Sequence, residues 1–187
     1  SIVLGIDACQ FSLELALWNY SNETLFERSF ERIDIAENVI SEIDLLLKDS
    51  GYSKFDLSLI SVAVGPGSFT GVRSSIAVAL GLSKGLGLPV IGVPTILGRF
   101  YANCLEKKPG GYLVSMQANK AENFCYPAFW GASAEVQNNN NVFINDGEIF
   151  IQNLSQAFCY PLNMNLREAI DFANKEYHSG LQQVDFI

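Results

Sequence analysis

The sequence LSLISVAVGPGSFTGVRSSIAVALGLSKGLGLPVIGV, residues 57–93, combines a strand, a glycine-rich turn, a helix and a second strand. Residues 57–64 are a continuous run rich in β-branched side chains, which is typical of a central, buried strand. The glycines of residues 65–71 end that run and predict a loop. Residues 72–86 are expected to form a helix, and residues 89–93 a short buried strand. This succession is typical of α/β proteins.

Three meandering strands are predicted before this stretch, at residues 2–6, 13–17 and 24–30. Residues 36–48 then change to helical spacing, with apolar side chains on one face and acidic ones opposite. A further helix is expected over residues 96–105. The resulting order is strand, strand, strand, helix, strand, helix, strand, helix. That order predicts an α/β protein with the ribonuclease-H-like layout, on which actin-like kinases and Hsp70 are built.

The chain is long enough for one large domain, or for one domain and a fragment of a second. We expect a first lobe over residues 1–107, with a mixed five-stranded sheet and helices, and an abbreviated second lobe over residues 108–187. A full second half would need many more residues than the 187 present. The second lobe is expected to contain two paired strands, a polar surface loop and a closing helix, at residues 112–116, 123–130, 137–141 and 166–177.

Composition narrows the range of functions. The formal net charge is -8, and the sequence pI is about 4.6. Proteins that bind phosphate backbones by themselves are usually basic, so direct tRNA or DNA binding by this chain alone is disfavoured. The single histidine, His178, argues against a zinc site. The sequence contains no CxxC motif, so we expect reduced, buried thiols at its four cysteines, Cys9, Cys104, Cys125 and Cys159.

The apolar segments do not predict a membrane protein. Asp7 interrupts the first apolar run where a signal peptide would need unbroken apolar residues. Residues 76–97, the most apolar stretch, are interrupted by Lys84, Pro89 and Pro94. We therefore expect a soluble cytoplasmic protein.

The loop GPGSFTGVR invites comparison with phosphate-binding loops because helix N-termini attract anions. A P-loop requires GxxxxGK[ST], but Gly65 and Gly71 are one residue too far apart, and Val72 replaces the lysine. A dinucleotide loop requires GxGxxG, and here the spacing is GxGxxxG. The alternative is a tight turn with Ser68 or Thr70 capping the next helix. Arg73 then suits a salt bridge better than an anion site.

The same loop, followed by an Ala/Gly-rich helix and LPVIGVPT at residues 88–95, resembles the TsaB family, also called YeaZ. The motif residues that carry the resemblance are Gly65, Pro66, Gly67, Ser68, Phe69, Thr70, Gly71 and Arg73. The resemblance implies an actin-like or Hsp70-like fold and no bound cofactor. It also implies a non-catalytic subunit beside the catalytic paralogue TsaD, with the ATPase TsaE and the enzyme TsaC supplying other steps. Together these proteins form N6-threonylcarbamoyladenosine in tRNA, which this chain would meet only through the complex. A homodimer of the isolated chain stays open as an alternative assembly.

The sequence lacks the full set of catalytic residues that each of three enzyme classes would need. A sugar-kinase-like phosphotransferase needs glycine and hydroxyls after the strand-end aspartate, but the sequence after Asp7 is Ala-Cys-Gln-Phe. A ribonuclease-H-like nuclease needs three or four converging carboxylates, and only Asp7 with Glu37 or Glu42 is available. A protease would need a base, and His178 has no recognisable nucleophile motif. A degenerate nucleotide-binding, kinase-like enzyme and a self-associating scaffold without a tRNA role stay open as alternatives.

The helices at residues 36–48 and 72–86 are the predicted docking surface for TsaD. The first has a wider apolar face than one sheet requires. The second has glycines in its middle, which cost about 1 kcal/mol each relative to alanine and therefore need a reason. That reason is close packing, either on the protein's own sheet or on a partner helix. The predicted partner-binding residues are Val39, Ile40, Ile43, Leu47, Ser74, Ala77, Val78, Gly81 and Gly85.

Overall fold

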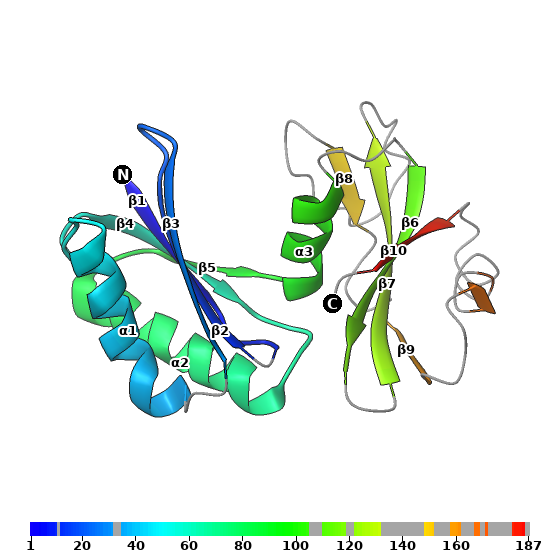
Figure 1. Cartoon of the computed structure of the whole chain (residues 1–187), viewed down its shortest axis with the longest axis horizontal. Coiled ribbons are helices and arrows are strands. Elements are labelled where there is room, and N and C mark those ends of the chain that lie inside the picture. Colours follow the sequence, from blue (N-terminus) through cyan, green and yellow to red (C-terminus); the bar gives the residue numbers. More distant parts are fainter. Residues whose placement is uncertain are drawn as a thin grey trace. The chain divides into compact units, whose positions relative to one another are not determined.

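A computed structural model describes residues 1–10, 12–31, 35–104, 110–118, 122–131, 148–151, 158–161, 167–168, 171 and 181–185. The chain divides into two compact units, Ser1–Thr95 and Ile96–Ile187 (Figure 1). No helix among the described residues is long and apolar enough to cross a membrane.

Unit 1 is built on a mixed five-stranded sheet of order β3-β2-β1-β4-β5. The strands β1 (Ile2–Asp7), β2 (Ser12–Asn19) and β3 (Thr24–Glu31) form an antiparallel meander. The strands β4 (Leu57–Ala63) and β5 (Val90–Val93) add to β1 in parallel. This topology confirms the predicted ribonuclease-H-like fold with its mixed sheet.

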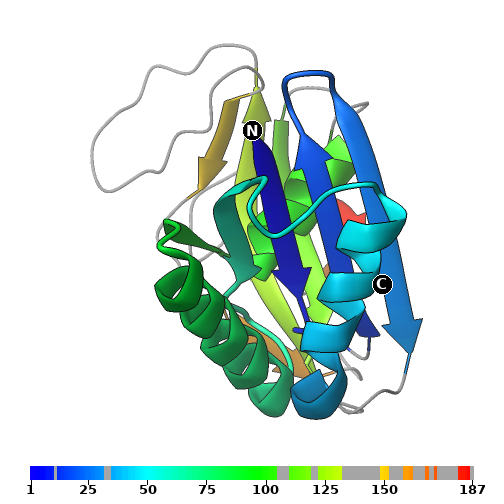
Figure 2. The ribbon, with the colours of Figure 1, turned by 90° about the vertical axis from the view of Figure 1, so that its left-hand side faces the viewer.

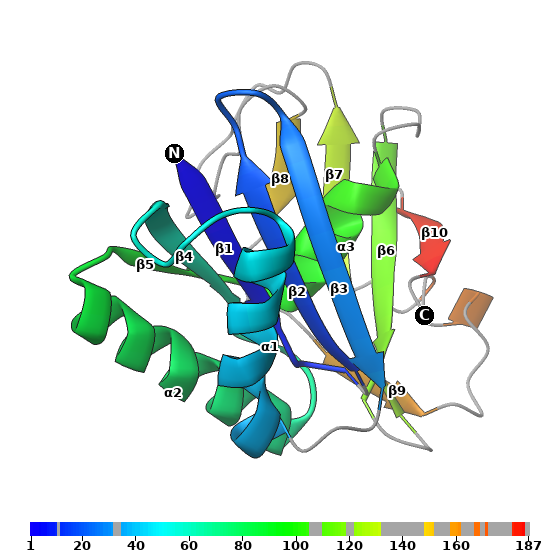
Figure 3. The same ribbon diagram turned by 60° about the vertical axis from the view of Figure 1, so that its left-hand side comes forward.

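Two helices, α1 (Ile35–Asp49) and α2 (Phe69–Leu86), cover the same face of this sheet (Figures 2 and 3). Alternation along the strands creates that face, since Leu4 lies opposite Leu17 and Ile6 opposite Leu15 in the β1–β2 register. These four side chains are at most 2% exposed and belong to the core beneath the helices. The core that positions the helices is therefore dictated by period-two patterning in the first two strands.

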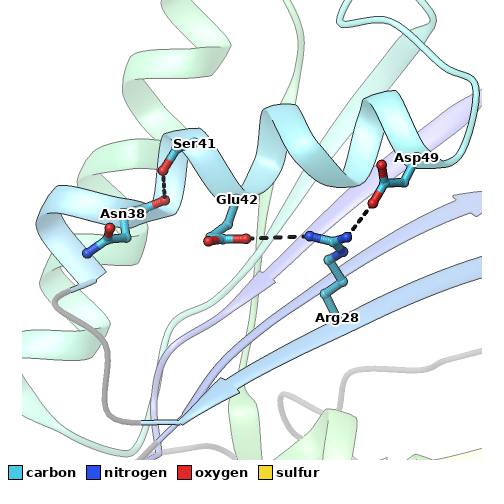
Figure 4. Close-up of polar contacts among 5 residues, drawn as sticks. All are labelled: Arg28, Asn38, Ser41, Glu42 and Asp49. Carbon is cyan, nitrogen blue, oxygen red and sulfur yellow. Dashed lines mark hydrogen bonds and ion pairs between the residues drawn. The ribbon is translucent and has the colours of Figure 1, made fainter.

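An ion-pair cluster fastens α1 to the edge strand β3. The guanidinium of Arg28 on β3 lies 3.6 Å from Glu42 and also bonds Asp49, both on α1 (Figure 4). One cation thus holds two carboxylates almost two turns apart on the helix. Arg28 and Glu42 are half-buried and Asp49 is exposed, and partly exposed pairs contribute only about 0–1 kcal/mol each, so the cluster orients α1 more than it stabilises the unit.

The helix α3 (Thr95–Cys104) starts at the last residue of unit 1, and its other residues belong to unit 2, which contains a second five-stranded sheet. Its strand path is β10 (Leu181–Asp185), β6 (Gly110–Gln117), β7 (Glu122–Gly131) and β8 (Glu148–Ile151), and β9 (Phe158–Pro161) also pairs with β7. The division falls earlier than the predicted limit at residue 107. The physical reason is that Ile96, Leu97 and Phe100 of α3 pack with Tyr112 and Val114 of β6.

The predicted elements of unit 1 agree with the structure, with one informative shift. The helix predicted over residues 72–86 begins at Phe69, because Ser68 is its N-cap. In unit 2, β6 and β7 confirm the predicted strand pair, whereas β8, β9 and β10 were not predicted. The polar tract at residues 137–141 and His178 lie outside the described residues, as does most of the predicted closing helix.

Candidate docking face and glycine-rich loop

The glycine-rich loop packs directly on the turn that follows β1. A Cβ atom added to Gly67 would overlap the carbonyl oxygen of Cys9, and one added to Gly71 would overlap the carbonyl oxygen of Ala8. Real side chains do not approach backbone atoms so closely, so only glycine fits at these two positions. These glycines of the motif are therefore explained by the contact between two loops.

Hydrogen bonds within the protein use four amides of this segment. The amide of Gly65 donates to Thr95 Oγ1 at 3.1 Å, and that of Ser68 donates to the carbonyl of Cys9 at 2.6 Å. The amides of Gly71 and Val72 donate to Ser68, at 3.3 Å to Oγ and 2.9 Å to the carbonyl. A phosphate-binding loop needs such amides unpaired and directed at the ligand. This loop instead directs them at its own chain.

Ser68 begins α2, as one of the two predicted caps. Its side chain accepts the bond from the Gly71 amide, while Thr70 lies exposed in the first helical turn. Arg73 is also exposed, and its guanidinium lies over the ring of Phe69 at 5.0 Å from the centroid. Within the described part of the chain no ion pair of Arg73 is found. The expected salt bridge of Arg73 is thus replaced by a cation–π contact.

The turn after β1 has few groups available for catalysis. Oδ1 of Asp7 accepts the amide of Cys9 at 2.8 Å, which is the local bond of an Asx turn. The thiol of Cys9 is buried 3.6 Å from the carbonyl of Ala63, and this burial raises its pKa to about 11. A neutral thiol is a poor nucleophile. No group of three or more metal-ligating side chains occurs among the residues described.

On α1, the predicted docking residues separate into two sets. Val39, Ile43 and Leu47 are 0–4% exposed and pack in the core beneath the helix. They are not accessible to a partner in this structure, which corrects their assignment to the docking face. Ile40 is 46% exposed, and Leu45 is 43% exposed. The apolar face of α1 is wide because some of its residues pack in the core and others are exposed to solvent.

On α2, the small residues of the predicted set point outward. Ala77, Gly81 and Gly85 are exposed, and a Cβ added to either glycine meets nothing within 4 Å. The sheet-facing positions of this helix are Gly71, Ser75 and Ala79. Packing on the protein's own sheet therefore does not explain Gly81 and Gly85. Of the remaining predicted residues, Ser74 is half-buried, and Val78 packs against the core.

The exposed surface also contains two residues, Leu45 and Leu80, that are not among the predicted partner-binding residues. Leu45 on α1 and Leu80 on α2 are 43% and 51% exposed, and α1 and α2 are packed side by side (Figure 2). Helical spacing could have separated these residues from the buried ones, since Leu80 lies one position after the buried Ala79. We define the docking face as the exposed residues Ile40, Leu45, Ala77, Leu80, Gly81 and Gly85.

Comparison with known proteins supplies the family. Residues 34–127, half of the chain, match the family model of TsaD, tRNA N6-adenosine threonylcarbamoyltransferase. The chain is 35% identical over 95 residues to the tRNA threonylcarbamoyladenosine biosynthesis protein TsaB of Escherichia coli K12, covering 51% of this chain and 41% of that protein. It is 34% identical over 126 residues to the protein of the same name from Buchnera aphidicola subsp. Baizongia pistaciae, covering 67% and 54%.

Comparison with solved structures agrees with the fold described above. YeaZ from Pseudomonas aeruginosa superposes with a TM-score of 0.67 at 20% identity, over 88% of this chain and 69% of that one. The chain spans about half the length of the curated relatives that it matches. With the sheet order, the glycine-rich loop and these matches together, the chain belongs to the TsaD family, in its TsaB (YeaZ) group.

Proposed function

We propose that this chain is a non-catalytic subunit in the formation of N6-threonylcarbamoyladenosine in tRNA, and that it binds and supports a TsaD-type catalytic subunit. Curated relatives named for this biosynthesis support the pathway. In this proposal a TsaE-type ATPase joins the same complex, tRNA is met only through the complex, and a homodimer forms only when the partner is missing.

The outward orientation of Gly81 and Gly85 is the observation that carries the docking proposal. Gly81 lies inside an 18-residue helix and Gly85 lies in its last turn, and the space around each is open. An exposed glycine in the helix interior, such as Gly81, costs about 1 kcal/mol relative to alanine, and no contact within unit 1 explains it. Glycines at such positions allow a partner helix to approach within the low end of the usual range of roughly 8–10 Å between axes.

The rest of the docking face fits the same role. Ile40, Leu45 and Leu80 are each between 43% and 51% exposed, although the chain has buried cores of its own. Exposed apolar side chains supply contact area that a partner would remove from water. We place the TsaD-type subunit on this face.

The lack of catalysis in this proposal rests on the glycine-rich loop. Its amides bond within the chain, and the carbonyls of Ala8 and Cys9 lie against its glycines. The alternative, a degenerate kinase-like enzyme, would need those groups to rearrange before a phosphate could bind.

The Gly81→Arg variant tests the proposal. The added side chain extends into open space, so we expect the variant to stay folded by circular dichroism while losing the complex with the TsaD-type subunit of the same organism. Ser29→Arg is the matched control, because Ser29 is an exposed position on β3, outside the docking face. The control should bind normally in the same pull-down. A folded Gly81→Arg protein that still binds normally would place the interface elsewhere.

A further inference from the structure

The two helices of the docking face carry opposite charges on their outer sides. The exposed charged residues of α1 are Glu37, Asp44, Lys48 and Asp49, and those of α2 are Arg73 and Lys84. The helix α2 lies in a longer segment without acidic residues, since none occurs between Asp56 and Glu106. The outer side of α1 is therefore mainly acidic, and that of α2 is entirely basic.

Of these charges, only that of Asp49 is paired, with Arg28, and the others form no ion pair among the described residues. Among the described residues, the ion pairs of α1 link Glu42 and Asp49 to Arg28, and none involves Glu37 or Asp44. Lys84 likewise has no ion pair in that part of the chain. Arg73 lies over the Phe69 ring, a contact that keeps its positive charge.

We propose that this division of charge orients the TsaD-type partner, which presents basic groups to α1 and acidic groups to α2. The inference rests on the proposed function, since it specifies the chemistry of the partner surface on the same face. Complementary charges steer the encounter, and like charges brought together disfavour the reversed orientation. The exposed apolar and small residues of the docking face would make the contact but are uncharged, so they do not select the orientation.

A second copy of this chain is the competing occupant, because its basic helix could face the acidic helix of the first. Each copy has a formal net charge of -8, so two copies repel as they approach. The net charge therefore favours a different protein as the partner.

Charge reversals on the two helices provide the test. Lys84→Glu on α2 and Asp44→Lys on α1 are made in the full chain, and association with the TsaD-type subunit is timed at low and high salt. We expect both variants to associate roughly tenfold more slowly at low salt, because each places like charges together. The difference should shrink at high salt, where exposed charges are screened.

Lys54→Glu is the control for net charge. Lys54 is exposed in the turn after α1, outside the two helices, and its reversal changes the net charge by the same amount as Lys84→Glu. This control should leave the association rate nearly unchanged.

Three results would overturn the inference. Opposite effects of Lys84→Glu and Asp44→Lys would mean that net charge alone steers the encounter. Normal association of both variants, with Gly81→Arg still abolishing the complex, would leave the proposed function intact and remove the orienting role. An effect seen only on self-association, measured by sedimentation, would assign the face to a second copy. If the unmodified chain formed no complex at all, the proposed function itself would fail.

Discussion

Gly67 packs on the carbonyl oxygen of Cys9, and the amide of the next residue, Ser68, donates a hydrogen bond to that oxygen at 2.6 Å. The first contact leaves no room for a side chain at residue 67. The hydrogen bond joins the glycine-rich loop to the turn that follows β1. Two segments almost 60 residues apart in the sequence are thereby joined at the end of the sheet where β1 and β4 both finish.

Substitution of Gly67 should therefore destabilise the protein, whereas substitution of a docking-face glycine should not. In Gly67→Ala the new methyl group meets the backbone of Cys9, and overpacking of this kind typically costs about 1–3 kcal/mol. In the matched variant Gly85→Ala the methyl group meets nothing, and the free energy of unfolding should rise by up to about 1 kcal/mol. Urea unfolding of both variants measures the difference. Equal effects would show that the loop contact is looser than described.

The buried thiol of Cys9 should make stability depend on pH in the alkaline range. Burial raises its pKa in the folded protein from 9.0 to about 11. The unfolded chain therefore releases this proton first as the pH rises, and the free energy of unfolding should fall between about pH 9 and pH 11. Cys9→Ala lacks the group, so its stability should fall less steeply over the same range. Parallel urea titrations at several pH values compare the slopes, and identical slopes would contradict the prediction.

The isolated chain should neither bind nor hydrolyse ATP. The amides that could hold a phosphate are bonded to Thr95, Cys9 and Ser68, and Asp7 accepts the amide of Cys9. Isothermal titration with Mg-ATP should give no heat of binding, and phosphate release should match the buffer. A micromolar dissociation constant with turnover would support the kinase-like alternative. An intact actin-like ATPase run alongside confirms that the nucleotide is active.

The sequence predicts the fold of unit 1 well because its signals are local. Leucines alternate along β2, apolar residues recur at helical spacing along α1, and a β-branched run marks β4. The sequence predicts a later start for α2 than the structure shows, because a glycine such as Gly71 is typical of turns. In the structure Gly71 lies in the first turn of α2 and packs against the carbonyl oxygen of Ala8. Such a close approach joins residues distant in sequence, and periodicity carries no information on it.

The docking face shows the same limit. Helical spacing identified the apolar side of α1, but it does not tell which residues enter the core. Val39 and Ile43 contact the sheet, whereas Ile40, beside Val39 in the chain, is exposed. For Gly81 the sequence left two packing directions open, and only the backbone position of α2 decides between them. The strands β8, β9 and β10 are four or five residues long. The equally short β5 could be predicted because it lies between two predicted helices, and no such pair of helices flanks these three strands.

The division at Thr95 and Ile96 places one of the two tryptophans in each unit. Trp18 lies on β2, 5.3 Å from the ring of Tyr20 between centroids, and Trp130 lies on β7. A chain with Trp130→Phe thus emits tryptophan fluorescence from unit 1 alone, and a chain with Trp18→Phe emits it from unit 2 alone. Coincident emission changes on heating would mean that the units melt as one cooperative body, and separate changes would give each unit a transition of its own.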